Sequence, residues 1–114
     1  MRRLALPFAF TLALGLAACS TADAAPSSPA EDPHAMVAEG ATLLDVRTPG
    51  EFSSGHIEGA VNIPISELGQ RMEEVPTDHS VVVYCLSGGR SASAASMLRS
   101  HGYQVHDLGP MSAW

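Results

Sequence analysis

A cysteine, two glycines and an arginine stand together in the stretch 84–91, which reads YCLSGGRS. Cys85 follows an apolar, β-branched run, and Arg90 comes just before a segment with helical character. A glycine-rich loop at this point turns backbone N–H groups inward, beside the positive end of the following helix. Together with the charge of Arg90, these groups favour the thiolate, which is the nucleophilic form of cysteine. The stretch therefore predicts a nucleophile at Cys85.

The alternative is that Cys85 only fills space in the core, since free cysteine is among the most buried residue types. Its position at the end of a strand, before a glycine-rich turn, an arginine and a helix, favours the nucleophile. The chain has two cysteines, and the other one is Cys19. If Cys19 carries a lipid, as argued below, Cys85 has no partner for an internal disulfide.

Short strands and helices alternate along the chain around this stretch. Strands are expected at 41–46, 60–63, 80–84 and 103–107, and helices at 34–39, from 48 onward, at 66–74 and at 91–101. This alternation predicts an α/β fold with a parallel or mostly parallel sheet. The run 80–84 is apolar on both faces, so it belongs in the middle of a sheet that helices cover on both sides. Cys85 would then lie at the carboxyl edge of the sheet, where the sites of such folds are found.

Two separate motifs resemble those of the single-domain rhodanese sulfurtransferases. The first is the stretch 84–91 itself. The second comprises DVRTPGEF at 45–52 and GHIEGAVNIP at 55–64, and it is similar to the family signature DVR-x-x-x-E-[FY]…GHI-x-GA-x-NIP. The resemblance covers about residues 34–114. It implies a three-layer rhodanese-like domain, with a mostly parallel central sheet and helices on both faces.

The resemblance also implies a reaction. The Cys85 thiolate would take the outer sulfur of a donor such as thiosulfate, hold it as a persulfide and pass it to cyanide or a thiol. The substrate would be bound by the loop residues, namely Leu86, Ser87, Gly88, Gly89 and Arg90. Neither a metal nor an organic cofactor is needed. Departures from the family include Leu86, which stands where many active members have Arg or Lys, and Pro110, which replaces the second glycine of a late Gly-Gly motif.

Three other functions fit parts of the pattern. Cysteine-dependent phosphatases, some of which share the rhodanese fold, use a Cys-x5-Arg loop, whereas the spacing from Cys85 to Arg90 is Cys-x4-Arg. A rhodanese-like domain could instead bind sulfur or a partner without turnover. Cys85 could also act alone as a redox sensor, without a resolving cysteine. The spacing and the retained cysteine in an intact loop favour sulfur transfer.

Polar residues of the second motif are expected to support the loop rather than to react. Asp45 ends a strand near the site and can support the loop through Arg47. Glu51 completes a capping box with Thr48 at a helix start. His56 lies in a turn, where we favour a structural role over that of a general base. The other histidines show no metal-ligand spacing, so no metal site is predicted.

The N-terminal segment predicts export. Residues 1–18 combine two arginines, an apolar run too short to span a membrane comfortably, and small residues, as a signal peptide does. The stretch 16–19 resembles the lipobox of bacterial lipoproteins, which implies lipidation of Cys19 and, with Ser20 next to it, transfer to the outer membrane. Cleavage after Ala24 is the alternative. Residues 19–33 are expected to form a flexible tether.

The charge balance limits the partners. Without residues 1–18, four arginines face twelve Asp and Glu residues, which gives a formal net charge of −8. A chain this acidic is not expected to bind nucleic acid or an anionic membrane surface through its folded part. The expected location is the periplasmic side of a bacterium, with membrane attachment only through a lipid on Cys19.

Overall fold

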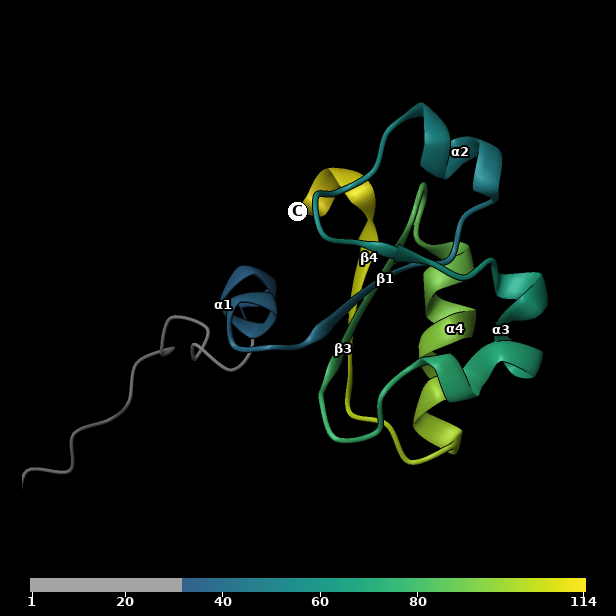
Figure 1. Cartoon of the computed structure of the whole chain (residues 1–114). Helices are drawn as coiled ribbons and strands as arrows, with labels where there is room; N and C mark the ends of the chain where they lie inside the picture. The colour runs from purple at the N-terminus through teal and green to yellow at the C-terminus, as the bar shows by residue number, and fades with distance from the viewer. Residues whose placement is uncertain (1–31) are drawn as a thin grey trace, which may run out of the picture.

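Four short strands pair in parallel to form one sheet, in the order β2-β1-β3-β4 (Figure 1). The computed structural model describes residues 32–114, so the predicted signal peptide, Cys19 and most of the predicted tether lie outside the described residues. The strands are β1 (Thr42–Asp45), β2 (Val61–Asn62), β3 (Val81–Cys85) and β4 (Val105–Pro110). The helices are α1 (Pro33–Ala38), α2 (Pro49–Ser54), α3 (Ile65–Arg71) and α4 (Gly89–Ser100), with the 3-10 turns η2 (Met72–Glu74) and η3 (Met111–Ala113).

The central position of β3 follows from its composition. All five of its residues are buried, and it pairs with β1 on one side and β4 on the other. Alternate side chains of the strand point to opposite faces of the sheet. Val83 packs in the apolar cluster under α4, and Val82 packs in the apolar cluster on the other face. The prediction of a strand buried on both faces is confirmed.

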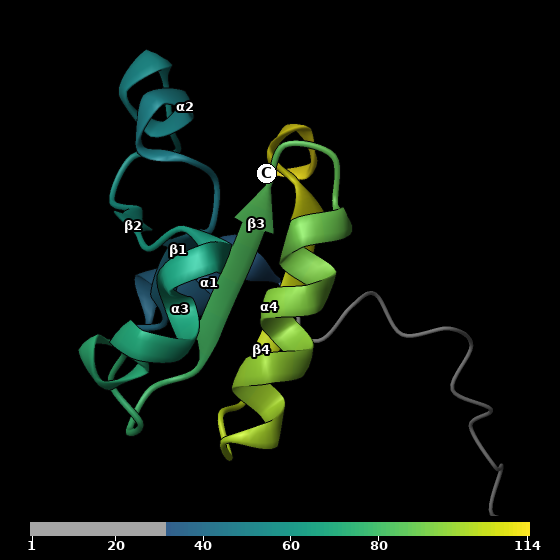
Figure 2. The same ribbon diagram turned by 90° about the vertical axis from the view of Figure 1, so that its right-hand side faces the viewer.

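Helices cover both faces of the sheet, which confirms the three-layer α/β architecture. One face packs against α3 and α4, where Ala94 and Ala95 let the helix approach the strands closely. The other face packs against α1 and the C-terminal turn η3, through Met36 and Met111 among others. Figure 1 shows α3 and α4 on the same side of the sheet, and in Figure 2, which looks onto that face, both helices lie in front of the strands. Within the described residues, none of the helices has the length and apolarity needed to cross a membrane.

Two boundaries at the site differ from the prediction. Cys85 is the last residue of β3 rather than the residue after the strand, because its backbone still pairs with Pro110 of β4. Helix α4 begins at Gly89 and not at Ser91, since Gly88 already serves as its N-cap. Arg90 therefore lies in the first turn of α4 rather than in the loop before it.

The last strand is also displaced, from the predicted 103–107 to Val105–Pro110. Gly109 and Pro110 are residue types that often end a strand, but among residues 32–114 β4 pairs with β3 alone and forms an edge of the sheet, where proline is tolerated. A register shift between Asp107 and Gly109 absorbs the left-handed backbone of Gly109, whose φ is +81°.

Candidate active site

The sulfur of Cys85 lies at the carboxyl edge of the central strand, under the loop that leads into α4. The residue is fully buried and belongs to the core cluster on the α4 face of the sheet. The backbone N–H of Gly88 donates to Cys85 Sγ at 3.0 Å. A hydrogen bond of this kind, in front of a helix N-terminus, stabilises negative charge on the sulfur.

The loop depends on the left-handed backbone of Gly88, whose φ is +105°. A Cβ at this position would lie 3.7 Å from Pro110 Cδ, an ordinary van der Waals contact, so the backbone conformation and not a lack of space favours glycine. Gly89 is different, because it has helical geometry as the first residue of α4 and a Cβ there would meet nothing within 4 Å. Gly88 therefore shapes the loop, whereas Gly89 only begins the helix.

Opposing influences act on the pKa of Cys85, and the net result is a lowered value. Burial acts to raise the pKa of the thiol. The Ser91 hydroxyl and the N–H groups of Ser91, Gly88 and Ser87 together lower this pKa by more than burial raises it. The Ser91 hydroxyl also donates to the Gly88 carbonyl at 2.9 Å. Because a hydroxyl has a single proton, it serves one of these acceptors at a time. The backbone N–H groups are therefore the steadier cause of the lowered pKa.

Arg90 does not face the cleft as a free cation, because it forms a bidentate ion pair with Glu51 of α2. The two guanidinium nitrogens lie 2.7 and 3.0 Å from the carboxylate oxygens. Glu51 also accepts from the backbone N–H and the hydroxyl of Thr48, both at 3.2 Å, and so completes the predicted capping box. The bond from Arg90 is the main cause that lowers the pKa of Glu51 to about 2. The local spacing of Thr48 and Glu51 predicts the cap, but nothing local predicts this ion pair.

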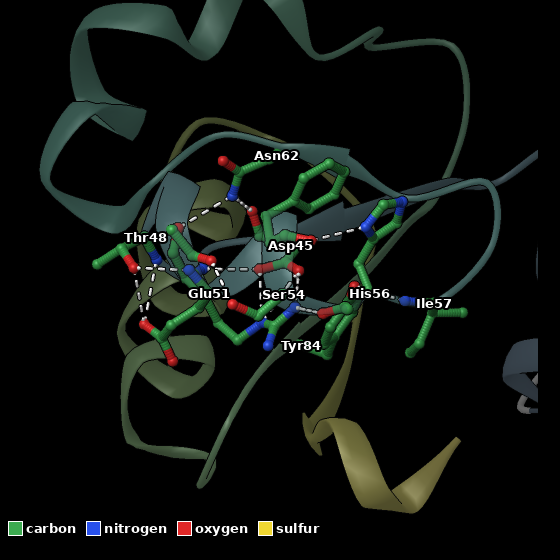
Figure 3. Close-up of polar contacts among 12 residues, drawn as sticks. Asp45, Thr48, Glu51, Ser54, His56, Ile57, Asn62 and Tyr84 are labelled. Carbon is green, nitrogen blue, oxygen red and sulfur yellow. Dashed lines mark hydrogen bonds and ion pairs between the residues drawn. The ribbon is translucent and has the colours of Figure 1, made fainter.

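A second ion pair, buried between Asp45 and Arg47, organises the chain after β1 (Figure 3). Arg47 Nη2 lies 2.7 Å from Asp45 Oδ2 and 2.7 Å from the carbonyl oxygen of Gly55. The Asn62 amide donates to the carbonyls of Asp45 and Arg47 at 3.0 and 2.9 Å. The guanidinium also sits 5.7 Å from the ring centre of Tyr84. These contacts tie β1, β2, the end of α2 and β3 together beside Cys85.

Tyr84 and His56 both form hydrogen bonds with the backbone at the end of α2 and in the turn after it. Tyr84 Oη accepts from the Ile57 N–H at 3.2 Å, and burial raises the pKa of this phenol to about 12. His56 is exposed; its Nδ1 lies 2.8 Å from the Phe52 carbonyl oxygen, and its ring stacks on Phe52 at 3.7 Å. Figure 3 shows both side chains around Asp45. Both residues thus fix the turn after α2.

A cleft of about 720 Å³ opens beside the loop, between α2 and the C-terminal turn. It is lined by Arg47, Thr48, Gly50, Glu51, Ser54, Gly55, Leu86 and Met111. Leu86 is 58% exposed there, although the sulfur of the preceding Cys85 is covered. Figure 1 shows α2 and the C-terminal turn at the same end of the sheet as the loop after β3.

Two smaller hollows, of about 240 and 210 Å³, share Asp78, His79 and Ser80 at the amino end of β3. They are more enclosed than the cleft, but they lie at the opposite edge of the sheet from Cys85. In residues 32–114, His, Cys, Asp and Glu side chains nowhere gather in a group of three that could hold a metal ion.

Comparison with known proteins gives a consistent picture. The model of the Rhodanese-like domain family matches residues 29–114. The protein YqhL of Bacillus subtilis is 53% identical over 76 residues, which cover 65% of this chain and 60% of YqhL, less than two thirds of its length. The sulfurtransferase of Allochromatium vinosum is 42% identical over 78 residues, covering 67% of this chain and 73% of that protein. The thiosulfate sulfurtransferase GlpE of Stutzerimonas stutzeri is 35% identical over 88 residues, covering 75% and 81%.

Comparison with solved structures points to the same family. The crystal structure of a rhodanese-related protein from Thermoplasma volcanium superposes with a TM-score of 0.63 at 37% identity, covering 68% of this chain and 78% of that one.

Proposed function

Because the chain belongs to the rhodanese-like domain family, we propose that it is a sulfurtransferase that carries sulfur as a persulfide on Cys85. The observation that carries the proposal is the place of the Cys85 sulfur, 3.0 Å from the Gly88 nitrogen and in front of α4. N–H groups aimed at this sulfur stabilise a thiolate before the reaction and a persulfide anion after it.

The proposed cycle consists of two displacements at sulfur. In the first, the Cys85 thiolate attacks the outer sulfur of thiosulfate, the S–S bond of the donor breaks, and sulfite leaves with the bonding electrons. In the second, cyanide or a thiolate attacks the outer sulfur of the persulfide, and the Cys85 thiolate leaves. Each step forms one bond and breaks one, so the cycle needs no external oxidant or reductant.

The burial of Cys85 adds a requirement to this cycle. Because the residue has no exposed surface, a donor reaches the sulfur only when the groups that cover it move aside. This observation favours a second candidate function, in which the domain takes up and holds sulfur without rapid turnover. The two candidates share the persulfide and differ in how fast it is discharged.

Intact-mass measurement tests the persulfide. The protein is incubated with thiosulfate, freed of excess donor and weighed before and after cyanide is added, with Cys85→Ser as the matched control. We expect a one-sulfur increment on the wild type that cyanide removes and that the variant lacks. A wild type without the increment, or a variant that carries the same one, would show that Cys85 does not hold sulfur.

Turnover separates the two candidates. With thiosulfate and cyanide both in excess, an enzyme for this reaction releases thiocyanate much faster than the same mixture does with Cys85→Ser. If the persulfide forms but thiocyanate is released no faster than in that control, the domain is a sulfur carrier.

A further inference from the structure

Strand β4 contains a bulge beside the Cys85 loop. Asp107 and Gly109 are paired with consecutive residues of β3, so Leu108 is an extra residue in β4. A bulge of this kind bends a strand and redirects the residues that follow it. The residue that follows here is Pro110, which is paired with Cys85. The bulge therefore decides how β4 meets the carboxyl end of the central strand.

The side chain of Asp107 holds this bulge together. Its Oδ1 accepts from the N–H of Gly109 at 2.9 Å, in the kind of turn that aspartate and asparagine form with the backbone two residues further on. The bond closes over the left-handed backbone of Gly109, whose φ is +81°. Its loss should loosen Gly109 and Pro110 relative to β3.

The bulge also lies against the loop that covers the sulfur. The three atoms nearest to a Cβ on Gly88 would be Pro110 Cδ, Gly109 Cα and Pro110 N, at 3.7, 3.9 and 3.9 Å. Gly88 is the residue whose N–H donates to Cys85 Sγ at 3.0 Å. Because Gly109 and Pro110 pack beside Gly88, their placement by the bulge helps to fix the direction of this N–H.

We propose that Asp107 is a positioning residue for the Cys85 nucleophile, which fixes the bulge of β4 and thereby keeps the Gly88 N–H directed at the sulfur. Asp107 acts through Gly109, Pro110 and Gly88, and the reacting atom remains Cys85 Sγ. The inference rests on the proposed persulfide function for its consequence in sulfur transfer. Its effect on the thiol itself can be measured without a sulfur donor.

The charge of Asp107 and its position predict opposite results when the side chain is removed. A nearby carboxylate disfavours the thiolate, so the loss of its charge alone would lower the pKa of Cys85. The Gly88 N–H is one of the groups that lower this pKa, so a loosened loop would raise it. The sign of the change therefore identifies the role of Asp107.

The test measures the iodoacetamide alkylation of Cys85 against pH in the full chain, followed by mass spectrometry of the peptide that contains Cys85. Asp107→Ala should move the midpoint to higher pH and lower the rate at pH 7 about threefold. Asp107→Asn keeps an acceptor oxygen in the same place, so its midpoint should lie at or below that of the wild type. Asp107→Glu keeps the charge, but its longer side chain does not fit the same turn, so it should behave like Asp107→Ala.

Asp78→Ala is the matched control. It removes the same charge from an exposed residue at the amino end of β3, and it should leave the midpoint unchanged. Persulfide loading gives a second measurement. Asp107→Ala and Asp107→Glu should load more slowly at saturating thiosulfate, while the thiosulfate concentration for half saturation stays the same, because the change affects the nucleophile and not the binding of the donor.

The outcomes separate this inference from the proposed function. A folded Asp107→Ala whose midpoint is unchanged or lower overturns the positioning role. If Asp107→Ala does not fold, the other two variants decide: equal midpoints in Asp107→Asn and Asp107→Glu, or a higher midpoint in Asp107→Asn alone, overturn it as well. If the midpoints shift as expected but thiosulfate never loads the wild type, Asp107 positions the thiol and the proposed function is wrong.

Discussion

The thiol of Cys85 is the residue on which the function depends, and two opposing influences set its ionisation. Burial favours the neutral thiol, whereas the Ser91 hydroxyl and the surrounding N–H groups favour the thiolate. The second influence is the larger in sum, so the pKa of Cys85 lies below its ordinary value of 9.0. More of the protein therefore carries a nucleophile at neutral pH than an isolated cysteine would provide.

The pH dependence of alkylation follows from this lowered pKa. Since the thiolate is the reactive form, the iodoacetamide reaction rate of the folded protein should rise with pH and reach its midpoint below 9.0. The same protein in denaturant should reach its midpoint near the ordinary pKa of cysteine, and Cys85→Ser supplies the background rate. Equal midpoints in the folded and denatured chains would contradict the stabilisation of the thiolate by the loop.

For a single residue such as Cys85, the residue type and its neighbours are enough to predict a nucleophile, because the glycines of the loop and the start of the helix are adjacent to it in the sequence. The state of Arg90 was not accessible in the same way. Its partner Glu51 is 39 positions away, and only the fold brings α2 and the start of α4 together. That Arg90 binds the donor stays a prediction, and the ion pair with Glu51 argues for a weaker attraction to an anionic donor.

At the scale of the elements, the shape of the loop between β3 and α4 depends on the backbone conformation of Gly88. Its φ of +105° is unfavourable for any residue with a Cβ, although a Cβ would meet Pro110 only at an ordinary contact distance. Gly88→Ala should lower the free energy of unfolding by about 1 to 2 kcal/mol, as is usual for a side chain forced into left-handed backbone. It should also slow persulfide loading, because the N–H that faces Cys85 Sγ moves with the loop.

Gly89→Ala is the matched control for this prediction. Gly89 is exposed and helical, so alanine there should leave stability unchanged or raise it slightly. Urea unfolding of both variants, followed by loading under identical conditions, gives the comparison. Equal losses in the two variants would show that the backbone conformation of Gly88 is not what shapes the loop.

Among the elements, the helix start of α2 was predictable because a capping box is local: Thr48, Pro49 and Glu51 specify it within four positions. The end of β4 was not predictable in this way. Gly109 and Pro110 can belong to a strand only where that strand lies at the edge of the sheet. The position of β4 at the edge is set by its pairing with β3, which joins segments distant in the sequence.

At the scale of the whole molecule, the alternation of strands and helices and the apolar β3 indicated a layered α/β fold with a buried central strand. The order β2-β1-β3-β4 did not follow from the sequence, since each pairing is a contact between distant segments. The edge at which the site lies did follow, because parallel strands place their carboxyl ends together.

We also propose that the chain is exported and anchored by a lipid on Cys19, a residue outside the described part of the structure. The motif at 16–19 supports this, and the net charge supplies a physical test. With a formal charge of −8 after residue 18, the chain should be repelled by anionic lipid headgroups. Attachment to a membrane should therefore survive high salt and yield to detergent, as an acyl anchor does.

Fractionation of bacterial cells that express the full chain tests this anchor. The wild type and Cys85→Ser should both sediment with membranes, whereas Cys19→Ser should appear in the soluble fraction, because only the first cysteine would carry the lipid. A wild type that is soluble would favour cleavage after Ala24. A Cys19→Ser protein that stays in the membrane fraction would mean that some other part of the chain holds it there.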